Sequence, residues 1–408
     1  MPDIRVTFMG LPFKTPFLLA SGQATTAPGE IAKHCQEIAQ NGWAGLVTKT
    51  IIPQYGAYKR PHLWSSESFR SLGMTNSGPP LSVYSGDLMK RLGEDIEAAH
   101  LAKLIIIPSI IANSLEEWAS MADEIAHLGA DALELNLSCP SPGDYVKESL
   151  GGYLVGQDIE MTRRVVETVC RACRIPVMPK LTFHAPHIGK SAKCCKEAGA
   201  AAVSAINTIR GIIGVDLRTG KILSEGFNGR TYLGGISGPM IRPFGLRAVA
   251  EIKMEEDLEV CGIGGVEGWK NAIEYFLLGA TMVQVCTAAM WNGFRIGKVL
   301  KAGLIKYMEK KDYTSLKDFI GMALRDIDQK QIQEMARAWP DVEEQKCNLC
   351  CRCVRACSDA AYGALYRDGG RIGVDQKKCE GCGLCRIVCR EDAIHYRLLP
   401  ILSKEGRR

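Results

Sequence analysis

The chain has 408 residues, of which 46% are hydrophobic and 23% are charged, and its formal net charge is +5. This length and composition are typical of a globular protein with one large and one small domain, and the dispersed charges give no indication of a nucleic-acid partner. The N-terminus has neither a long apolar run nor a signal-peptide layout, so we expect a cytoplasmic protein without a membrane anchor.

The first segments predict a hairpin, a strand and a helix. Residues 4–13 carry two short apolar runs, which we expect to pair and close the floor of a barrel. An apolar strand at 17–20 is followed by Ser21 and Gly22, which open a loop of small residues. A helix is expected over 28–41.

The next strand, 45–51, carries Lys49 on the same face as Val47 and Ile51. If this face points inwards, the strand places a lysine in the mouth of the barrel. The segment 52–85 that follows is long and rich in Pro, Gly and Ser, and it contains Asn76. Long segments of this kind are commonly binding loops or lids.

The stretch 130–140 predicts one buried strand with strict alternation. Three leucines point to one side, whereas Glu134, Asn136 and Ser138 point to the other. A barrel strand accommodates this pattern if its inner face ends in a polar site, and Cys139 then lies where the strand gives way to a loop. The structural alternative is a core strand with satisfied polar residues and a small buried thiol.

Strands and helices alternate over about 300 residues, which predicts an α/β fold of the (β/α)8 TIM-barrel type. A doubly wound sheet competes, but no Gly-x-Gly-x-x-Gly follows the first strand, and the similar stretch 262–268 has Glu267 at the third glycine position. The expected strands are 17–20, 45–51, 104–110, 131–138, 175–182, 201–207, 258–263 and 281–286, with helices between them such as 115–128, 158–173, 189–198 and 267–278. The domains expected are a barrel over 1–295, a helical connector over 296–345, a small cysteine-rich domain over 346–400 and a tail over 401–408.

The cysteines concentrate near the C-terminus. Of the 17 cysteines in the chain, nine lie between 347 and 389, in two runs that each contain Cys-x-x-Cys-x-x-Cys-x-x-x-Cys. This distribution indicates metal clusters in a reducing compartment, and the double spacing is that of two [4Fe–4S] clusters. Structural zinc is the alternative, although zinc sites do not require this double spacing.

In two-cluster ferredoxins the fourth cysteine of each run binds the other cluster. Cys351 is therefore an extra cysteine that we expect not to bind iron. The proline that usually follows each fourth cysteine is replaced by Ser358 and Arg390. One cluster would take Cys347, Cys350, Cys353 and Cys389, and the other would take Cys357, Cys379, Cys382 and Cys385.

Polar residues near the C-terminal ends of the expected barrel strands form a second candidate site. Lys180 and Thr182 share one face of their strand, and Asn207 and Thr208 end the next one. A lone lysine is usually a solvated charge, but several polar residues at strand ends are typical of a barrel active site.

Glycine-rich turns and hydroxyls follow the later strands, where barrels often bind phosphate; ordinary tight turns are the alternative. A phosphate-bearing cofactor beside two lysines suits a flavin, because a cation near N1 and the C2 carbonyl stabilises the anionic reduced ring. The candidate cofactor-binding residues are Ser21, Gly22, Lys49, Lys180, Gly235, Ser237, Gly264, Gly265, Cys286 and Thr287.

Together these motifs resemble the flavin-and-ferredoxin part of dihydropyrimidine dehydrogenases, including the bacterial subunits that carry those domains. They are similar, more distantly, to class 1 dihydroorotate dehydrogenases. The matching stretches extend over almost the whole chain. They are 16–21, 48–50, 129–140, 180–182, 207–208, 234–242, 264–265, 283–286 and both cysteine runs.

The resemblance implies that the barrel over 1–295 binds FMN and that residues 346–400 form a ferredoxin-like domain with two [4Fe–4S] clusters. It implies an enzyme that reduces, or reversibly oxidises, the C5=C6 bond of a pyrimidine such as uracil or thymine. Hydride would pass from FMN N5 to one carbon while Cys139 protonates its neighbour. A free thiol has a pKa near ~8.5 and is largely protonated at neutral pH, so it can act as an acid. The glycine-rich loop 141–156 is expected to close over the site. The residues implied to hold the substrate are Asn76, Asn136, Asn207 and Thr208.

Departures from the pyrimidine pattern leave the ring substrate open. Gly78 stands where the resemblance calls for a glutamate, and Phe183 and His184 follow the Lys180 motif where the pyrimidine enzymes differ. One alternative is the same chemistry on dihydroorotate or another unsaturated ring or enoyl substrate. Another is an electron-transfer subunit without its own substrate. Because no nicotinamide fingerprint is present, we expect a separate FAD- and NAD(P)-binding partner or a ferredoxin, and an oligomer.

Overall fold

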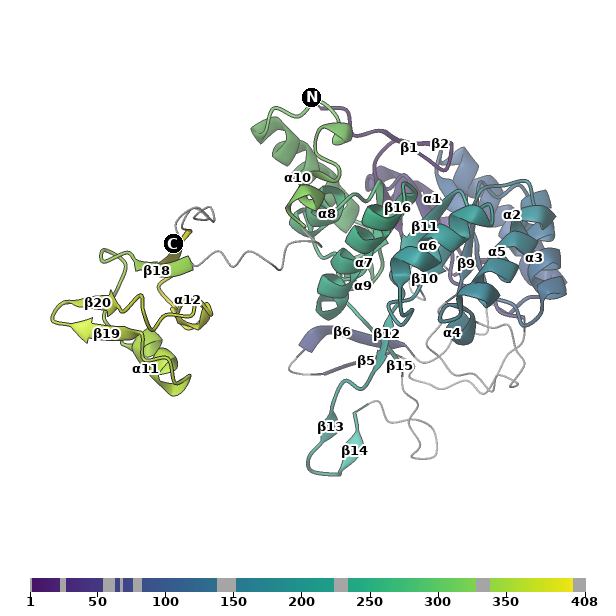
Figure 1. Ribbon diagram of the computed structural model, residues 1–408. Coiled ribbons are helices and arrows are strands. Elements are labelled where there is room, and N and C mark those ends of the chain that lie inside the picture. The colour runs from purple at the N-terminus through teal and green to yellow at the C-terminus, as the bar shows by residue number, and fades with distance from the viewer. Residues whose placement is uncertain are drawn as a thin grey trace, which may run out of the picture. The chain divides into compact units, whose positions relative to one another are not determined.

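The computed structural model describes residues 2–22, 27–53, 63–66, 69–75, 83–137, 152–223, 234–327 and 338–398. The chain divides into two compact units, Met1–Asp326 and Ile327–Arg408. The first unit contains a parallel sheet surrounded by helices, and the second contains short hairpins and helices (Figure 1).

The parallel sheet of the first unit closes on itself. Its two end segments, β7 (Ile105–Ile107) and β8 (Ser109–Ile110), belong to one strand that is interrupted at Pro108. β7 pairs with β4 and β8 pairs with β9, so the circle is complete and the predicted (β/α)8 barrel is confirmed. Between these ends the order is β4 (Gly45–Val47), β3 (Phe17–Leu19), β17 (Met282–Val285), β16 (Glu259–Ile263), β11 (Ala202–Ala205), β10 (Val177–Leu181) and β9 (Leu133–Asn136).

Helices cover the outer face of the barrel (Figure 1). Their apolar faces pack on the outward-facing strand residues. The helices are α1 (Cys35–Gln40), α2 (Gly86–Leu101), α3 (Leu115–His127), α4 (Gly152–Val155), α5 (Ile159–Ala172), α6 (Ile188–Glu197), α7 (Arg242–Glu255), α8 (Trp269–Leu277) and α9 (Thr287–Asn292). The helices α2, α3 and α5 begin at side-chain caps: Ser85, Ser114 and Asp158 each accept a hydrogen bond from a backbone N–H three residues later.

The N-terminal hairpin closes the barrel floor, as predicted. β1 (Val6–Phe8) pairs with β2 (Leu11–Phe13) in antiparallel register. The rings of Phe8 and Phe13 are fully buried and pack with Leu18 at the lower end of the barrel interior. This end of the barrel is therefore apolar, and polar chemistry is left to the opposite end.

A small antiparallel sheet is added at the C-terminal end of the barrel strands. It contains β12 (Ile209–Gly211), β15 (Gly234–Ser237), β6 (Phe69–Thr75) and β5 (Leu63–Ser66), in that order. A further hairpin, β13 (Val215–Asp216) with β14 (Lys221–Ile222), follows β12. The segment 52–85 was expected to be a long loop, but its described residues include the two strands β5 and β6.

The helical stretch after the barrel packs on it. The buried side chains of Leu300, Leu304 and Met308 recur every four residues along α10 (Ile296–Lys310) and join the main core, as does Phe319. The first compact unit therefore continues to Asp326, beyond the boundary at 295 that the sequence suggested.

The second unit holds both cysteine runs. Its strands pair in two antiparallel hairpins, β18 (Ala338–Val342) with β21 (Ile394–Leu398) and β19 (Leu365–Asp368) with β20 (Arg371–Val374). Its helices, α11 (Arg352–Asp359) and α12 (Leu384–Ile387), each begin inside a cysteine run. Across the described part of the chain, no helix has the length and apolar character needed to span a membrane.

Candidate active site and cluster-binding cysteines

Side chains in the barrel interior lie in layers. The lowest layer is apolar and includes Met178 and Met282. Because strand residues alternate, those two positions further along each strand also point inwards. On four strands these residues are polar, and all four are buried: Glu134 on β9, Lys180 on β10, Ser204 on β11 and Gln284 on β17.

These four residues form the middle layer of the barrel interior, and the carboxylate of Glu134 contacts the other three. Its Oε1 lies 2.6 Å from the ammonium Nζ of Lys180. Its Oε2 accepts hydrogen bonds from Ser204 Oγ at 3.0 Å and from Gln284 Nε2 at 3.1 Å. A buried charge is tolerated when it is paired and hydrogen-bonded in this way.

The layer above contains a chain of amides and hydroxyls. Asn136 Nδ2 donates to Thr50 Oγ1 at 2.9 Å, and that hydroxyl lies 3.1 Å from Ser109 Oγ. Asn207 Nδ2 donates to Asn136 Oδ1 at 2.9 Å, and the backbone N–H of Thr208 donates to Asn207 Oδ1 at 2.8 Å. The structure thus brings together three residues that the resemblance assigned to the substrate, in one fixed arrangement.

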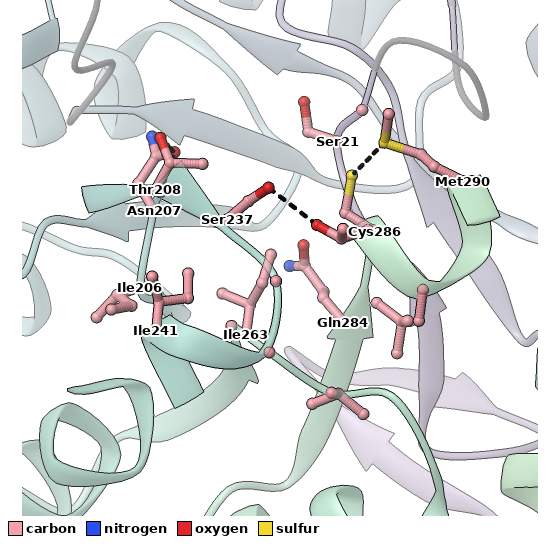
Figure 2. Close-up of a pocket in the computed structure, with 18 of the residues that line it drawn as sticks. Ser21, Ile206, Asn207, Thr208, Ser237, Ile241, Ile263, Gln284, Cys286 and Met290 are labelled. Atoms are coloured by element: carbon pink, nitrogen blue, oxygen red, sulfur yellow. Dashed lines mark hydrogen bonds between the residues drawn. The ribbon is translucent and has the colours of Figure 1, made fainter. Parts of the chain in front are cut away.

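A cavity of about 260 Å³ opens above these two layers. In Figure 2, Asn207 and Thr208 lie on one side of it, and Cys286 and Met290 lie on the other. Apolar side chains such as Ile206, Ile241 and Ile263 line its lower wall. Twelve predicted site residues line it: Ser21, Gly22, Lys49, Asn136, Lys180, Asn207, Thr208, Ser237, Gly264, Gly265, Cys286 and Thr287.

One end of the cavity is built from turns that follow β15, β16 and β17. Thr287 Oγ1 donates to Ser237 Oγ at 3.0 Å, which joins two strand ends (Figure 2). Gly265 has a φ of +66°, and a Cβ there would lie 2.8 Å from the carbonyl oxygen of Gly238. No side chain fits at this position, because the turn after β16 packs directly against the backbone of the turn after β15. Glycine-rich turns of this kind can present backbone N–H groups to a phosphate.

The polar atoms around the cavity fit an isoalloxazine ring. Because Gln284 Nε2 donates to Glu134, the carboxamide oxygen of Gln284 faces away from that carboxylate. This Oε1 is buried and has no hydrogen-bond partner among the described residues. It therefore offers an acceptor to a ring N–H, while Lys49 and Lys180 offer donors and positive charge to ring carbonyls.

The thiol of Cys286 lies among these groups. Burial raises its pKa, and the nearby lysines Lys49 and Lys180 oppose that shift. Its Sγ donates to the sulfur of Met290 at 3.7 Å (Figure 2). We infer that Cys286 lines the cavity as an uncharged thiol and does not act as an acid or base.

Three predicted site residues are placed differently or not described. Gly235 lies within β15, paired with Arg210 and Thr75, and is not among the described residues that line the cavity. Asn76 and Cys139 lie outside the described residues, as does most of the loop 141–156.

Two of the residues that depart from the pyrimidine pattern, Phe183 and His184, follow β10, and Gly78 lies outside the described residues. His184 Nε2 accepts a hydrogen bond from the backbone N–H of Arg210 at 3.2 Å. Burial, together with the charge of Arg210, lowers the pKa of His184. The ring of Phe183 packs 4.9 Å from that of Phe244. Among the described residues that line the cavity, neither Phe183 nor His184 is found. His184 contacts β12, whereas Phe183 contacts α7.

Sequence reasoning did not assign Thr50, Ser204 or Gln284 to the site, and it treated Glu134 only as an unusual strand residue. The available signal was strand parity. Ser204 and Gln284 each stand two residues from an inward-facing neighbour, as Glu134 does from Asn136. Thr50 directly follows Lys49, so parity gave no signal for it.

The two cysteine runs of the second unit surround two separate cavities. Each cavity is lined by the first three cysteines of one run and the fourth cysteine of the other. Within the described residues, no three His, Cys, Asp or Glu side chains form a group that could hold a single metal ion. The sets are Cys347, Cys350, Cys353 and Cys389 around one cavity, and Cys357, Cys379, Cys382 and Cys385 around the other.

The backbone repeats itself around the two cavities. Cys351, the extra cysteine, has a φ of +59° and takes the place of Gly383, whose φ is +85°. The thiol of Cys351 donates to the carbonyl of Leu349 at 3.3 Å. The fourth cysteines each accept a backbone N–H: Cys357 from Ala364 at 3.2 Å, and Cys389 from Ala393 at 3.4 Å. Such N–H···S bonds are typical of iron–sulfur sites, and the arrangement fits thiolate-bound clusters.

Comparisons with known proteins agree with this division. Residues 3–308 match the dihydroorotate dehydrogenase family, and residues 372–395 match the 4Fe–4S binding domain. The second match includes only the second cysteine run.

Relatives fall into two groups. The NAD-dependent dihydropyrimidine dehydrogenase subunit PreA of Escherichia coli (strain K12) is 29% identical over 378 residues, covering 89% of this chain and 87% of that protein. The catalytic subunit of dihydroorotate dehydrogenase B (NAD(+)) is 34% identical over 325 residues in Pyrococcus furiosus, covering 79% of this chain and 99% of that protein. Its counterpart in Thermoplasma volcanium is 30% identical over 329 residues, covering 80% of this chain and 100% of that protein. These matches confirm the resemblance that the motifs indicated.

Proposed function

Because this chain belongs to the dihydroorotate dehydrogenase family, we propose that it is the flavin- and cluster-carrying subunit of an enzyme that reduces, or reversibly oxidises, the C5=C6 bond of a pyrimidine such as uracil or thymine. Membership of the family makes the chain an FMN-dependent oxidoreductase that acts on CH–CH bonds. The 4Fe–4S match adds an iron–sulfur motif in the second unit.

One observation favours uracil or thymine over dihydroorotate as the substrate: the share of this chain that aligns with each relative. The PreA subunit aligns over 89% of this chain, which is more than the barrel unit alone can supply. The dihydroorotate dehydrogenase relatives align over nearly their whole length, but with only 79–80% of this chain. The barrel unit alone is long enough for that alignment. A barrel with an attached cluster unit is therefore the arrangement that this chain has in common with PreA.

The residues of the upper layer have definite tasks in this proposal. Asn136 and Asn207, oriented by Thr50 and Thr208, hold the amide groups of the ring. When bound, FMN supplies hydride exchange with the ring carbon. Cys139 gives a proton from Sγ to the neighbouring carbon in reduction and removes it in oxidation. A thiol near its ordinary pKa of ~8.5 is mostly protonated at neutral pH and therefore serves as the acid.

Electrons leave or enter through two [4Fe–4S] clusters in this proposal. The two cysteine-lined cavities support two clusters, each bound by cysteines from both runs. The partner would be a separate FAD- and NAD(P)-binding subunit or a ferredoxin, since the sequence has no nicotinamide fingerprint. We expect the purified chain not to oxidise NADH or NADPH by itself; direct oxidation would remove the need for a partner.

Turnover with an artificial donor tests the substrate. The purified chain, anaerobic and supplied with reduced methyl viologen, should convert uracil or thymine to the dihydro product, detected by mass spectrometry. Cys139→Ala should be slower by about 10²–10⁴-fold, with unchanged FMN and iron contents. Equal rates in the variant and the parent would remove Cys139 from the mechanism.

Dihydroorotate is the second candidate substrate. The Pyrococcus furiosus relative is 34% identical, and Gly78 and His184 depart from the pyrimidine pattern. Orotate consumption in the same assay, without conversion of uracil or thymine, would establish this function. An electron-transfer subunit without a substrate would not require two amides on the cavity wall, so the Asn136–Asn207 pair favours an enzyme with its own substrate.

A further inference from the structure

We propose that Glu134 is a positioning residue that sets the charge beneath the flavin pocket and, through it, the reduction potential of the flavin. This inference rests on the proposed function in assuming that FMN occupies the cavity. Glu134 is 0% exposed and is not itself among the described residues that line the cavity, whereas its partners Lys180 and Gln284 are. Any effect of Glu134 on the flavin must therefore pass through these partners or through its charge.

The first part of the argument concerns charge. The Lys180 ammonium, 4% exposed, lies 2.6 Å from the Glu134 carboxylate, so the pair is neutral as a whole. Water cannot screen a charge at this depth, and an unpaired ammonium would act on a ring above it at nearly full strength. Because positive charge near the ring favours the reduced, anionic flavin, Glu134 limits how far Lys180 stabilises that form.

The second part concerns orientation. The Glu134 carboxylate accepts from Gln284 Nε2 at 3.1 Å, so the carboxamide of Gln284 is held with its oxygen on the other side. That oxygen is buried, lines the cavity and has no hydrogen-bond partner among the described residues. Ser204 holds the same carboxylate oxygen from the next strand at 3.0 Å. One acidic side chain thus fixes two of the groups that a flavin would contact.

Three variants separate charge from shape. Glu134→Gln keeps the shape and gives the Glu134–Lys180 pair a net charge of +1. Lys180→Met leaves a net charge of −1, and the double variant has none. We expect the midpoint potential of the flavin to follow this charge: highest in Glu134→Gln, lowest in Lys180→Met, with the double variant between them. In Glu134→Gln the reduced form should gain at least tenfold over the parent, which is ~30 mV for a two-electron couple.

The potentials would be measured by anaerobic dye titration of the holoprotein. The affinity of FMN-free protein for FMN would be measured separately, because a loss of Gln284 orientation should weaken it. Glu134→Asp keeps the charge but shortens the side chain. It should leave the equilibrium constant for flavin reduction within threefold of the parent's. Equal shifts in Glu134→Asp and Glu134→Gln would mean a structural role only and would overturn the proposal.

A matched control comes from the opposite end of the barrel. Glu259 on β16 is half-buried and accepts a hydrogen bond from the backbone N–H of Met9 at 2.6 Å. Glu259→Gln should leave the flavin potential unchanged. If Glu134→Gln binds FMN with the parent's potential, the inference about Glu134 fails while the proposed function stands. If the parent itself binds no FMN, the proposed function fails first.

Discussion

At the scale of single residues, the site depends on which atoms of its amides are already engaged. Asn136 uses Oδ1 to accept from Asn207 and Nδ2 to donate to Thr50. Asn207 in turn accepts from the backbone N–H of Thr208. Each carboxamide therefore has one orientation, since exchanging its oxygen and nitrogen would place donor against donor or acceptor against acceptor.

Asn207→Asp tests this orientation. A carboxylate at this position would place an acceptor against Asn136 Oδ1, at a cost of about 1–3 kcal/mol. We expect KM for the ring substrate to rise at least tenfold with FMN content unchanged, as measured by steady-state kinetics. Asn271→Asp, on the outer helix α8, should leave KM unchanged. A parental KM in Asn207→Asp would mean that this amide does not position the substrate.

The middle layer shows what could not be read from the sequence at residue scale. The pairing of Lys180 with Glu134 follows from the neighbouring strands β10 and β9, and their polar faces were visible as alternation. The contact between Glu134 and Gln284 joins residues 150 positions apart across the barrel. Only closure of the barrel brings them together, and no local pattern encodes the relative register of such distant strands.

At the scale of elements, β12 is held by a histidine that must be neutral. His184 Nε2 can accept from the N–H of Arg210 only in its unprotonated state. Its pKa is lowered by burial and by the charge of Arg210, so below pH ~6.5 the unfolded chain takes up a proton that the folded chain binds less tightly. Its contribution to stability is therefore present above that pH and is lost as the pH falls.

His184→Gln tests this dependence, because a glutamine oxygen can accept the same hydrogen bond without titrating. Between pH 7.5 and 5.5, the parent should lose up to about 1 kcal/mol more unfolding free energy than the variant. Chemical denaturation at both pH values measures the difference. His127→Gln, at an exposed position on α3, controls for the substitution itself. Identical slopes for His184→Gln and the parent would contradict the role of His184.

The turn after β16 lines the cavity and packs tightly against the turn after β15. Gly265→Ala combines a left-handed φ of +66° with a Cβ 2.8 Å from the Gly238 carbonyl. We expect at least tenfold weaker FMN binding, measured by fluorescence titration of FMN-free protein. Gly220→Ala is the matched control, because Gly220 has a φ of +68° and no atom within 4 Å of the added Cβ. Weakened FMN binding in both variants would point to general instability instead of the turn.

Elements were predictable where one pattern dominated. All eight barrel strands lie within their expected ranges, because apolar alternation between helices identifies them. The strands β5 and β6 were not anticipated, because their residues show no regular apolar alternation within a segment rich in turn formers. The packing of α10 was left open, because a charged helix with a narrow apolar stripe resembles a solvated connector.

At the scale of the whole molecule, the two cysteine runs form a pair of sites that neither run forms alone. The spacing indicated that each fourth cysteine crosses to the other run, and the two cavities have this arrangement. The structure adds the backbone N–H groups of Ala364 and Ala393, which donate to those fourth cysteines. Sequence spacing could not reveal these contacts, because the donor stands seven residues after Cys357 in one run but four residues after Cys389 in the other.

Paired variants test the crossing directly. Cys357 and Cys379 line the same cavity, so Cys357→Ala with Cys379→Ala should lose one cluster and keep about four of the expected eight irons. Cys389 lines the other cavity, so Cys389→Ala with Cys379→Ala should disturb both. Iron analysis and electron paramagnetic resonance distinguish the cases. The reverse pattern of losses would mean that each run binds its own cluster.

The reaction of the reduced flavin with the ring is the most direct test of the central claim. The purified protein would be reduced anaerobically until the flavin absorbance bleaches, and uracil, thymine or orotate would then be added. We predict that uracil or thymine restores the oxidised flavin spectrum. Reoxidation by orotate alone, or by none of the three in protein that holds FMN and about eight irons, would contradict a subunit that reduces uracil or thymine.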